Sequence, residues 1–174
     1  MEKIYLILMH TNTIPSKLVK FFTRYEYSHV GISLKKDCDI VYSFGRRNVN
    51  SILGGGFVAQ PRNGEFFDKF NNTVCKIYEI DINQQQYKKV KEIINEMEVN
   101  AEKYKYDFRG IVPRFFGIPV TIEDRYVCSY FVADVLEKAD IHKFDKKVCF
   151  IKPKDFEKVN KCNEIYRGYY NLYQ

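Results

Sequence analysis

Short runs of apolar residues, several of them alternating with polar ones, divide much of this chain into predicted β-strands. Residues 4–9 are all apolar, which is typical of a strand buried on both faces. Residues 74–82 alternate between two faces, as a half-buried strand does. Residues 27–34 and 40–44 flank a short polar segment, so they predict an antiparallel hairpin. The tyrosine-rich residues 165–173 predict a final strand.

Apolar residues spaced three and four positions apart predict two firm amphipathic helices. The first covers residues 84–103, and core packing explains its apolar stripe more simply than a partner groove does. The second begins near Cys128, and its stripe contains Cys128, Phe131, Val132, Val135 and Leu136. A shorter helix is predicted to start at Pro15, because proline is favoured in the first turn, and its apolar face is Leu18, Val19 and Phe22.

Two segments show neither period and are predicted to be irregular. Residues 48–63 contain three glycines at 54–56 that do not lead into the Gly-Lys-Ser/Thr of a phosphate-binding loop, so we expect a flexible loop or lid. Residues 106–119 are rich in glycine, proline and aromatic side chains. No repeat or linker interrupts the chain, so the sequence predicts one α+β domain over residues 1–174, with an antiparallel sheet packed against helices.

Composition and charge narrow the classes of partner. The 174 residues are 45% hydrophobic and carry a net charge of +6, from 28 basic and 22 acidic side chains. The charges are scattered, with no run of five like signs, which favours an ordinary solvated surface. A basic nucleic-acid-binding domain is a third-ranked hypothesis, because charge and aromatics support it but no motif does. We expect no nucleic-acid partner.

The cysteines predict free thiols in a reducing compartment. Their number is odd, and they form neither a CxxC pair nor a Cys/His cluster, so no disulfide framework, metal or other cofactor is expected. The apolar run near the N-terminus is too short for a signal peptide, and no stretch approaches the length of a transmembrane helix. The sequence therefore predicts a cytoplasmic protein. The five are Cys38, Cys75, Cys128, Cys149 and Cys162.

Cys128 is the first candidate for chemistry. With Thr121, Glu123 and Asp124 as capping and first-turn residues, it is predicted to lie near the N-terminal end of its helix. There the helix dipole and free amides favour a thiolate, and the same amides can stabilise an oxyanion. Simple core packing is the alternative, because a free cysteine often behaves as a small apolar side chain.

His29 is the matching candidate base, on the first strand of the predicted hairpin. A turn centred on residues 36–37 places Ser43 or a neighbour opposite it, on the same face, where its hydroxyl can accept a hydrogen bond from the imidazole. A register shift of one residue exchanges Ser43 for Tyr42 or Phe44. A buried, hydrogen-bonded core histidine is the alternative explanation of His29.

The order of these motifs resembles a known family. The chain resembles the circularly permuted papain-like hydrolases of the NlpC superfamily, including the YiiX-like and lecithin:retinol acyltransferase-like branches. The resemblance rests on Ser28-His29-Val30-Gly31-Ile32, on the hairpin after it and on a late Tyr126-Val127-Cys128-Ser129 that opens a helix. The resemblance implies a permuted papain-like fold, with Cys128 as nucleophile and His29 as base. The strand after His29 then supplies the third residue, often a histidine or an acidic side chain in the family and Ser43 here.

The predicted function is a cysteine-dependent hydrolase or acyltransferase that cleaves an amide, thioester or ester bond through an acyl-enzyme on Cys128. Its substrate is a small molecule, a peptide or a lipid acyl group, anionic groups included. Tyr126, Tyr42 and Arg109 are the predicted substrate-binding residues, with Arg114 and Arg125 as further candidates to line the cleft. The alternative is a non-catalytic member of the fold that binds a peptide, lipid or cell-wall fragment in the same cleft.

Overall fold

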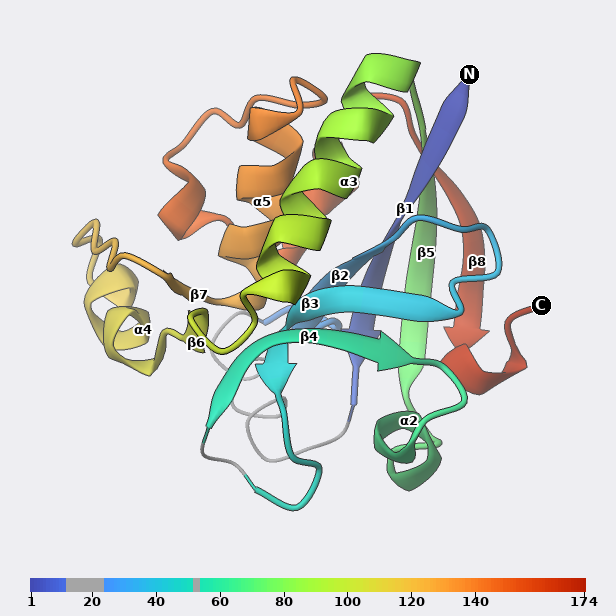
Figure 1. Cartoon of the computed structure of the whole chain (residues 1–174), viewed down its shortest axis with the longest axis horizontal. Helices are drawn as coiled ribbons and strands as arrows, with labels where there is room; N and C mark the ends of the chain where they lie inside the picture. Colours follow the sequence, from blue (N-terminus) through green and yellow to red (C-terminus); the bar gives the residue numbers. More distant parts are fainter. Residues whose placement is uncertain (12–23, 52–53) are drawn as a thin grey trace.

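A computed structural model describes residues 1–11, 24–51 and 54–174, so the helix predicted after Pro15 lies outside the described residues. In the described part of the chain, one curled sheet of eight strands runs in the order β7-β6-β4-β3-β2-β1-β5-β8 (Figure 1). In chain order these are β1 (Glu2–His10), β2 (His29–Ser33), β3 (Ile40–Arg46), β4 (Gly55–Pro61), β5 (Val74–Ile82), β6 (Lys105–Tyr106), β7 (Arg125–Tyr126) and β8 (Cys162–Tyr169).

The strand pairing confirms the predicted antiparallel sheet and hairpin. Neighbouring strands are antiparallel throughout, except for the short parallel pair β6–β7. Strands β1 and β2 pair along the whole of β2, with Met9 opposite His29. Strands β2 and β3 pair at Ile32 and Tyr42. They remain in contact toward His29, because the Ser43 hydroxyl donates a hydrogen bond to the Val30 carbonyl oxygen.

Helices α3 (Gln84–Val99) and α5 (Cys128–Lys138) contact each other and cover one face of the sheet (Figure 1). Both were predicted from apolar periodicity, and both predictions are confirmed. Helix α3 starts where it does because Asn83 and Gln86 form a capping box, each side chain accepting a hydrogen bond from the other residue's amide. The remaining helices are α2 (Glu65–Lys69), α4 (Phe108–Phe115) and the 3-10 turns Val148–Phe150, Pro153–Lys158 and Tyr170–Leu172.

The sheet is buried on both faces, as the wholly apolar residues 4–9 predicted. One set of β1 side chains belongs to the core beneath α3 and α5: Ile4, Leu6 and Leu8. The alternate set belongs to a second, smaller core, closed by α2 and the C-terminal turn: Tyr5, Ile7 and Met9. The mixture of a largely antiparallel sheet with helices confirms the predicted α+β class. No described helix combines the length and the apolar character needed to cross a membrane.

The segment 48–63 was predicted to be irregular, and this was wrong for its second half. Strand β4 occupies Gly55–Pro61 and pairs with β3 along its full length. Gly56 is required here by packing, because a Cβ on it would lie 2.4 Å from the Tyr104 carbonyl oxygen. Gly55 and Gly56 therefore allow close approach of neighbouring backbone, and the sequence pattern does not distinguish this role from flexibility.

The segment 106–119 was also predicted to be a loop, but it contains strand residue Tyr106 and helix α4. The helix forms because the Asp107 carboxylate caps it, accepting a hydrogen bond of 2.9 Å from the Gly110 amide. The sequence did not predict this helix, because Gly110 and Pro113 inside it are poor helix formers.

Candidate functional site

Cys128 is the first residue of α5, and the extended Val127 before it is the N-cap. The location at a helix N-terminus was predicted, but the predicted cap was not correct. Thr121, Glu123 and Asp124 lie before β7, and the helix begins without a side-chain cap. The amides of the first turn are consequently not occupied by a capping side chain. Cys128 itself is buried, with 6% of its surface exposed.

Three backbone groups act to lower the pKa of the Cys128 thiol: its own amide, that of Ser129 and that of Val30 on β2. Burial raises the pKa of the Cys128 thiol above its ordinary value, and these amides oppose the shift without reversing it. The resting group is therefore a neutral thiol at pH 7. The Val30 amide belongs to the residue that directly follows His29, which places the sulfur at the start of β2.

His29 and Ser43 form a hydrogen-bonded pair. The Ser43 Oγ lies 3.0 Å from His29 Nε2 and 2.7 Å from the Val30 carbonyl oxygen. The hydroxyl has one proton, and the carbonyl can only accept it, so Ser43 must accept its other hydrogen bond from an Nε2–H. This fixes the neutral tautomer of His29, with Nδ1 as the nitrogen that carries a lone pair.

The predicted pairing of these two residues differs in register from the observed one. The Ile32–Tyr42 pair places Gly45 opposite His29 and Ser43 opposite Gly31. Ser43 still faces His29, because a shift of two residues keeps a side chain on the same face of a strand. The ring of His29 extends over Gly45, where an added Cβ would lie 3.7 Å from His29 Cε1.

Burial sets the charge of His29. The side chain is half-buried, and loss of water around the ring lowers its pKa from 6.5 to about 4. His29 is therefore neutral at pH 7 and able to accept a proton. Since the thiol of Cys128 is neutral too, the resting pair is not a thiolate–imidazolium ion pair.

The sulfur and the imidazole lie toward opposite faces of β2. Val30 and Cys128 belong to the core beneath α5, whereas His29 projects from the other face of β2. In the described part of the structure, no hydrogen bond joins Cys128 Sγ to His29. Val30 connects the two sides, because its amide acts on the Cys128 thiol and its carbonyl binds Ser43.

Tyr106, which was not among the predicted site residues, lies close enough to Cys128 to interact with it electrostatically. Burial raises the pKa of its phenol, so the phenol keeps its proton. Tyr126, one of the predicted substrate-binding residues, packs against Phe44 and Tyr130, and its hydroxyl lies 3.5 Å from Asp134 Oδ2.

The other predicted binding residues are distributed around the site without converging on it. Tyr42 stacks on Phe57, with ring centroids 6.4 Å apart. Arg109 is exposed on α4, and Arg125 is half-buried on β7. Arg114 is bound to the buried carboxylate of Asp107 and is therefore a structural cation. Among the described residues, none of these four side chains bonds to Cys128 or His29.

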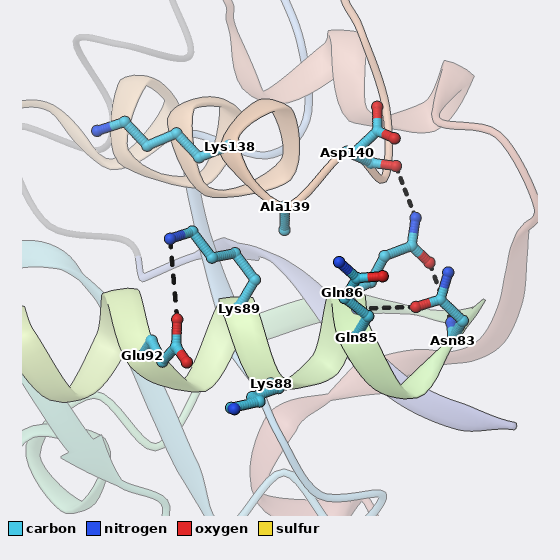
Figure 2. A pocket seen from close by; sticks show the side chains of 9 residues that line it. All are labelled: Asn83, Gln85, Gln86, Lys88, Lys89, Glu92, Lys138, Ala139 and Asp140. Carbon is cyan, nitrogen blue, oxygen red and sulfur yellow. Dashed lines mark hydrogen bonds and ion pairs between the residues drawn. The ribbon is translucent and has the colours of Figure 1, made fainter.

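A surface pocket of about 480 Å³ lies elsewhere, between the first turns of α3 and the C-terminal end of α5 (Figure 2). Cys128 is at the opposite end of α5, about 15 Å away along an eleven-residue helix. The pocket therefore plays no part in the candidate site. Its lining is mainly polar: Asn83, Gln85, Gln86, Lys88, Lys89, Glu92, Lys138, Ala139 and Asp140.

No protein-family model matches the chain, and a search of curated proteins finds no match. The structure is similar to the crystal structure of the metalloprotein YiiX from Escherichia coli O157:H7. The TM-score is 0.60 at 14% sequence identity, over 97% of this chain and 98% of that one. Within the described residues, no group of three histidine, cysteine or acidic side chains is arranged to hold a metal ion. What the chain shares with YiiX is the fold.

Proposed function

We propose that this chain is a thiol hydrolase or acyltransferase, built as a single permuted papain-like domain over residues 1–174. Cys128 is the nucleophile, His29 the base and Ser43 the residue that orients the base. The YiiX-like fold and the chain order, with the histidine strand before the cysteine helix, support the permuted assignment. Five free cysteines fit a reducing compartment such as the cytoplasm.

The observation that carries the proposal is the pair of hydrogen bonds made by Ser43. They hold His29 with its proton on Nε2, leaving Nδ1 to accept another. In a core histidine that only fills space, no particular tautomer is needed. Here the tautomer is fixed by a fully buried hydroxyl that is itself held by the backbone next to the Cys128 sulfur.

The chemistry follows from neutral starting groups. As the sulfur attacks the acyl carbon, His29 Nδ1 takes the thiol proton, an S–C bond forms and the carbonyl π-electrons move to oxygen. The imidazolium then donates that proton to the leaving nitrogen, oxygen or sulfur as its bond to carbon breaks. Water, or an acceptor alcohol or amine, releases the acyl group by the reverse sequence. Because no hydrogen bond joins the two residues at rest, they must move together when substrate binds.

The oxyanion of the tetrahedral intermediate has donors available. The Cys128 and Ser129 amides lie at the open N-terminus of α5, and the protonated phenol of Tyr106 is beside them. Donors that are held in place and shielded from water stabilise developing charge strongly. Tyr106 thus replaces Tyr126 as the proposed side chain of the oxyanion pocket.

Site-resolved alkylation with iodoacetamide near pH 7 tests the proposal. Cys162 is the most exposed of the five thiols, so passive labelling favours it. We expect Cys128 to react faster than Cys162, and His29→Ala to slow Cys128 by at least about 100-fold while leaving Cys162 unchanged. A p-nitrophenyl ester should leave an acyl group on Cys128, detected as a mass increase. The proposal is contradicted if the thiols are alkylated in the order of their solvent exposure, with Cys162 first, and if no acyl group is found on Cys128.

A second function, ligand binding without catalysis, is favoured by one observation. Thiol and imidazole are both neutral and unbonded to each other, and the third position holds a serine with no negative charge. In this case the fold binds a peptide, lipid or cell-wall fragment beside an inert Cys128. Unchanged ligand affinity in Cys128→Ala, together with no acyl adduct in the parent protein, supports this alternative.

A further inference from the structure

Helix α4 and the turn after it expose an unusual amount of apolar surface. Figure 1 shows this segment standing out from the side of the molecule beside β6 and β7, away from α3 and α5. Four large apolar side chains on it are more than half exposed: Phe108 at 52%, Val112 at 62%, Phe116 at 78% and Ile118 at 54%. We call these four residues the α4 apolar surface. Grouped exposure of this kind marks a contact site, whereas single exposed apolar residues do not.

Hydrogen bonds and an ion pair of Arg114 hold the α4 apolar surface in place. Arg114 is almost fully buried and binds the Asp107 carboxylate and, at 2.8–3.0 Å, the Val120 carbonyl oxygen. These bonds tie the start of α4 to the end of the following turn. The guanidinium also lies over the Tyr130 ring of α5, 5.9 Å from its centroid. The apolar side chains are therefore displayed on a supported scaffold.

An exposed cation lies on the same helix as most of the α4 apolar surface. Residues 108–122 contain two arginines and no acidic residue, and the exposed Glu123 follows at the far end of this segment. Arg114 is neutralised by Asp107, but Arg109 is exposed on α4 and has no partner among the described residues. The chain as a whole carries a net charge of +6. The net charge of the chain favours an anionic partner, and Arg109 supplies a cation for it on α4.

We infer that the α4 apolar surface docks on an anionic lipid bilayer. Phe108, Val112, Phe116 and Ile118 enter the boundary between headgroups and acyl chains, and Arg109 binds lipid phosphates. Apolar side chains that stand out of the surface, flanked by a cation, are the chemistry that peripheral membrane proteins use at this boundary.

The docking surface is continuous with the candidate site. Tyr106, whose phenol interacts with Cys128, precedes α4 by two residues and packs against Phe108 with the rings tilted and their centroids 4.6 Å apart. Docking through α4 thus brings the thiol close to the membrane surface, where lipid acyl esters are the nearest substrates. Docking itself does not depend on the proposed catalysis, because it needs neither Cys128 nor His29.

Vesicle co-sedimentation of the full chain tests this inference. The protein should partition onto phosphatidylcholine vesicles that contain phosphatidylglycerol and only weakly onto phosphatidylcholine alone. Removing two of the apolar anchors in Val112→Ser/Phe116→Ser should lower the partition coefficient at least about tenfold. Arg109→Gln should lower it about fivefold, and added salt should weaken binding of the parent more than of Arg109→Gln.

The matched control is Val99→Ser/Leu172→Ser, which removes two apolar side chains exposed elsewhere and should bind vesicles like the parent. Thermal unfolding by circular dichroism checks that the variants fold. Equal partitioning of the parent and Val112→Ser/Phe116→Ser overturns the inference. So does a lipid-free dimer, seen by analytical ultracentrifugation, that the same double variant abolishes, because the surface then binds a second copy. Neither outcome affects Cys128 alkylation, so docking and catalysis fail separately.

Discussion

Two clusters of ionisable side chains lie against the sheet. The surroundings of one favour the neutral forms of its groups, and the surroundings of the other favour the charged forms. At the start of β2, burial lowers the pKa of His29 to about 4 and raises that of Cys128, so both groups are kept neutral. On β5, Lys76 Nζ lies 2.6 Å from Glu157 Oε1 and 3.3 Å from Glu164 Oε2. Burial alone would lower the pKa of Lys76, but hydrogen bonds to its partners outweigh it and raise the pKa.

The difference separates a structural site from a reactive one. In the Lys76 cluster each charge has an opposite charge beside it, and the pKa values of Glu157 and Glu164 are lowered. Such a cluster stabilises the fold and resists proton transfer. Burial acts on Cys128 and His29, in contrast, without an opposite charge beside them in the described part of the chain, so their pKa values are shifted toward the neutral forms. Shifted pKa values of this kind are concentrated at catalytic sites. Substitutions in each cluster should therefore change different observables.

The largest effect on stability is expected for Lys76→Met, which leaves two carboxylates without their buried cation. We expect a loss of about 3 kcal/mol in the free energy of unfolding, measured by urea denaturation, with the ratio of Cys128 to Cys162 alkylation unchanged. The control is Lys138→Met. The Lys138 side chain is half exposed in its pair with Asp134, so the change should cost no more than about 0.5 kcal/mol. If Lys76→Met changes the ratio of Cys128 to Cys162 alkylation, the Lys76 cluster is not purely structural and the proposed difference between the two clusters is wrong.

Tyr106→Phe should slow acylation and spare alkylation. Removing one oxyanion donor costs about 100-fold in acyl transfer, equivalent to about 2.7 kcal/mol in the barrier. Alkylation by iodoacetamide forms no oxyanion, so its rate at Cys128 should be nearly unchanged. Tyr126→Phe is the control, because its hydroxyl lies near Asp134, and it should leave both rates intact. An equal loss in both reactions would assign Tyr106 to packing.

The pKa of His29 makes stability fall with acid in a defined window. Its folded pKa of about 4 lies below the ordinary 6.5, so the unfolded chain binds the proton more readily. The contribution is complete above pH 6.5, is lost as pH falls toward 4 and is constant below. Discounted for partial exposure, it amounts to about 2 kcal/mol. The difference in unfolding free energy between parent and His29→Gln should shrink by that amount across this window, and a constant difference would contradict the assignment.

The sequence predicted long periodic elements well and contacts that depend on packing poorly. Helix α5 and its start at Cys128 followed from apolar spacing, because one face of a helix repeats in a way that a local pattern records. The Ser43–His29 contact survived a register error of two residues, because strand faces alternate. Tyr106 was missed because its place beside the sulfur depends on the short parallel pair β6–β7, which joins segments twenty residues apart. No local pattern marks such a pairing.

The smallest effect, and the sharpest test of how the reactive site is oriented, is expected for Ser43→Ala. The change removes the acceptor that holds His29 Nε2–H and the donor to the Val30 carbonyl, so either ring nitrogen can then carry the proton. We expect Cys128 alkylation at pH 7 to slow about tenfold and stability to fall by about 1 kcal/mol. Ser129→Ala is the matched control, since it loses an equally buried hydrogen bond of 2.6 Å, to the Ile151 carbonyl, one residue from Cys128. It should cost similar stability while leaving the imidazole oriented and the labelling rate close to that of the parent. If both variants slow labelling equally, the effect of Ser43 is one of stability alone, and His29 loses its best evidence for a catalytic role.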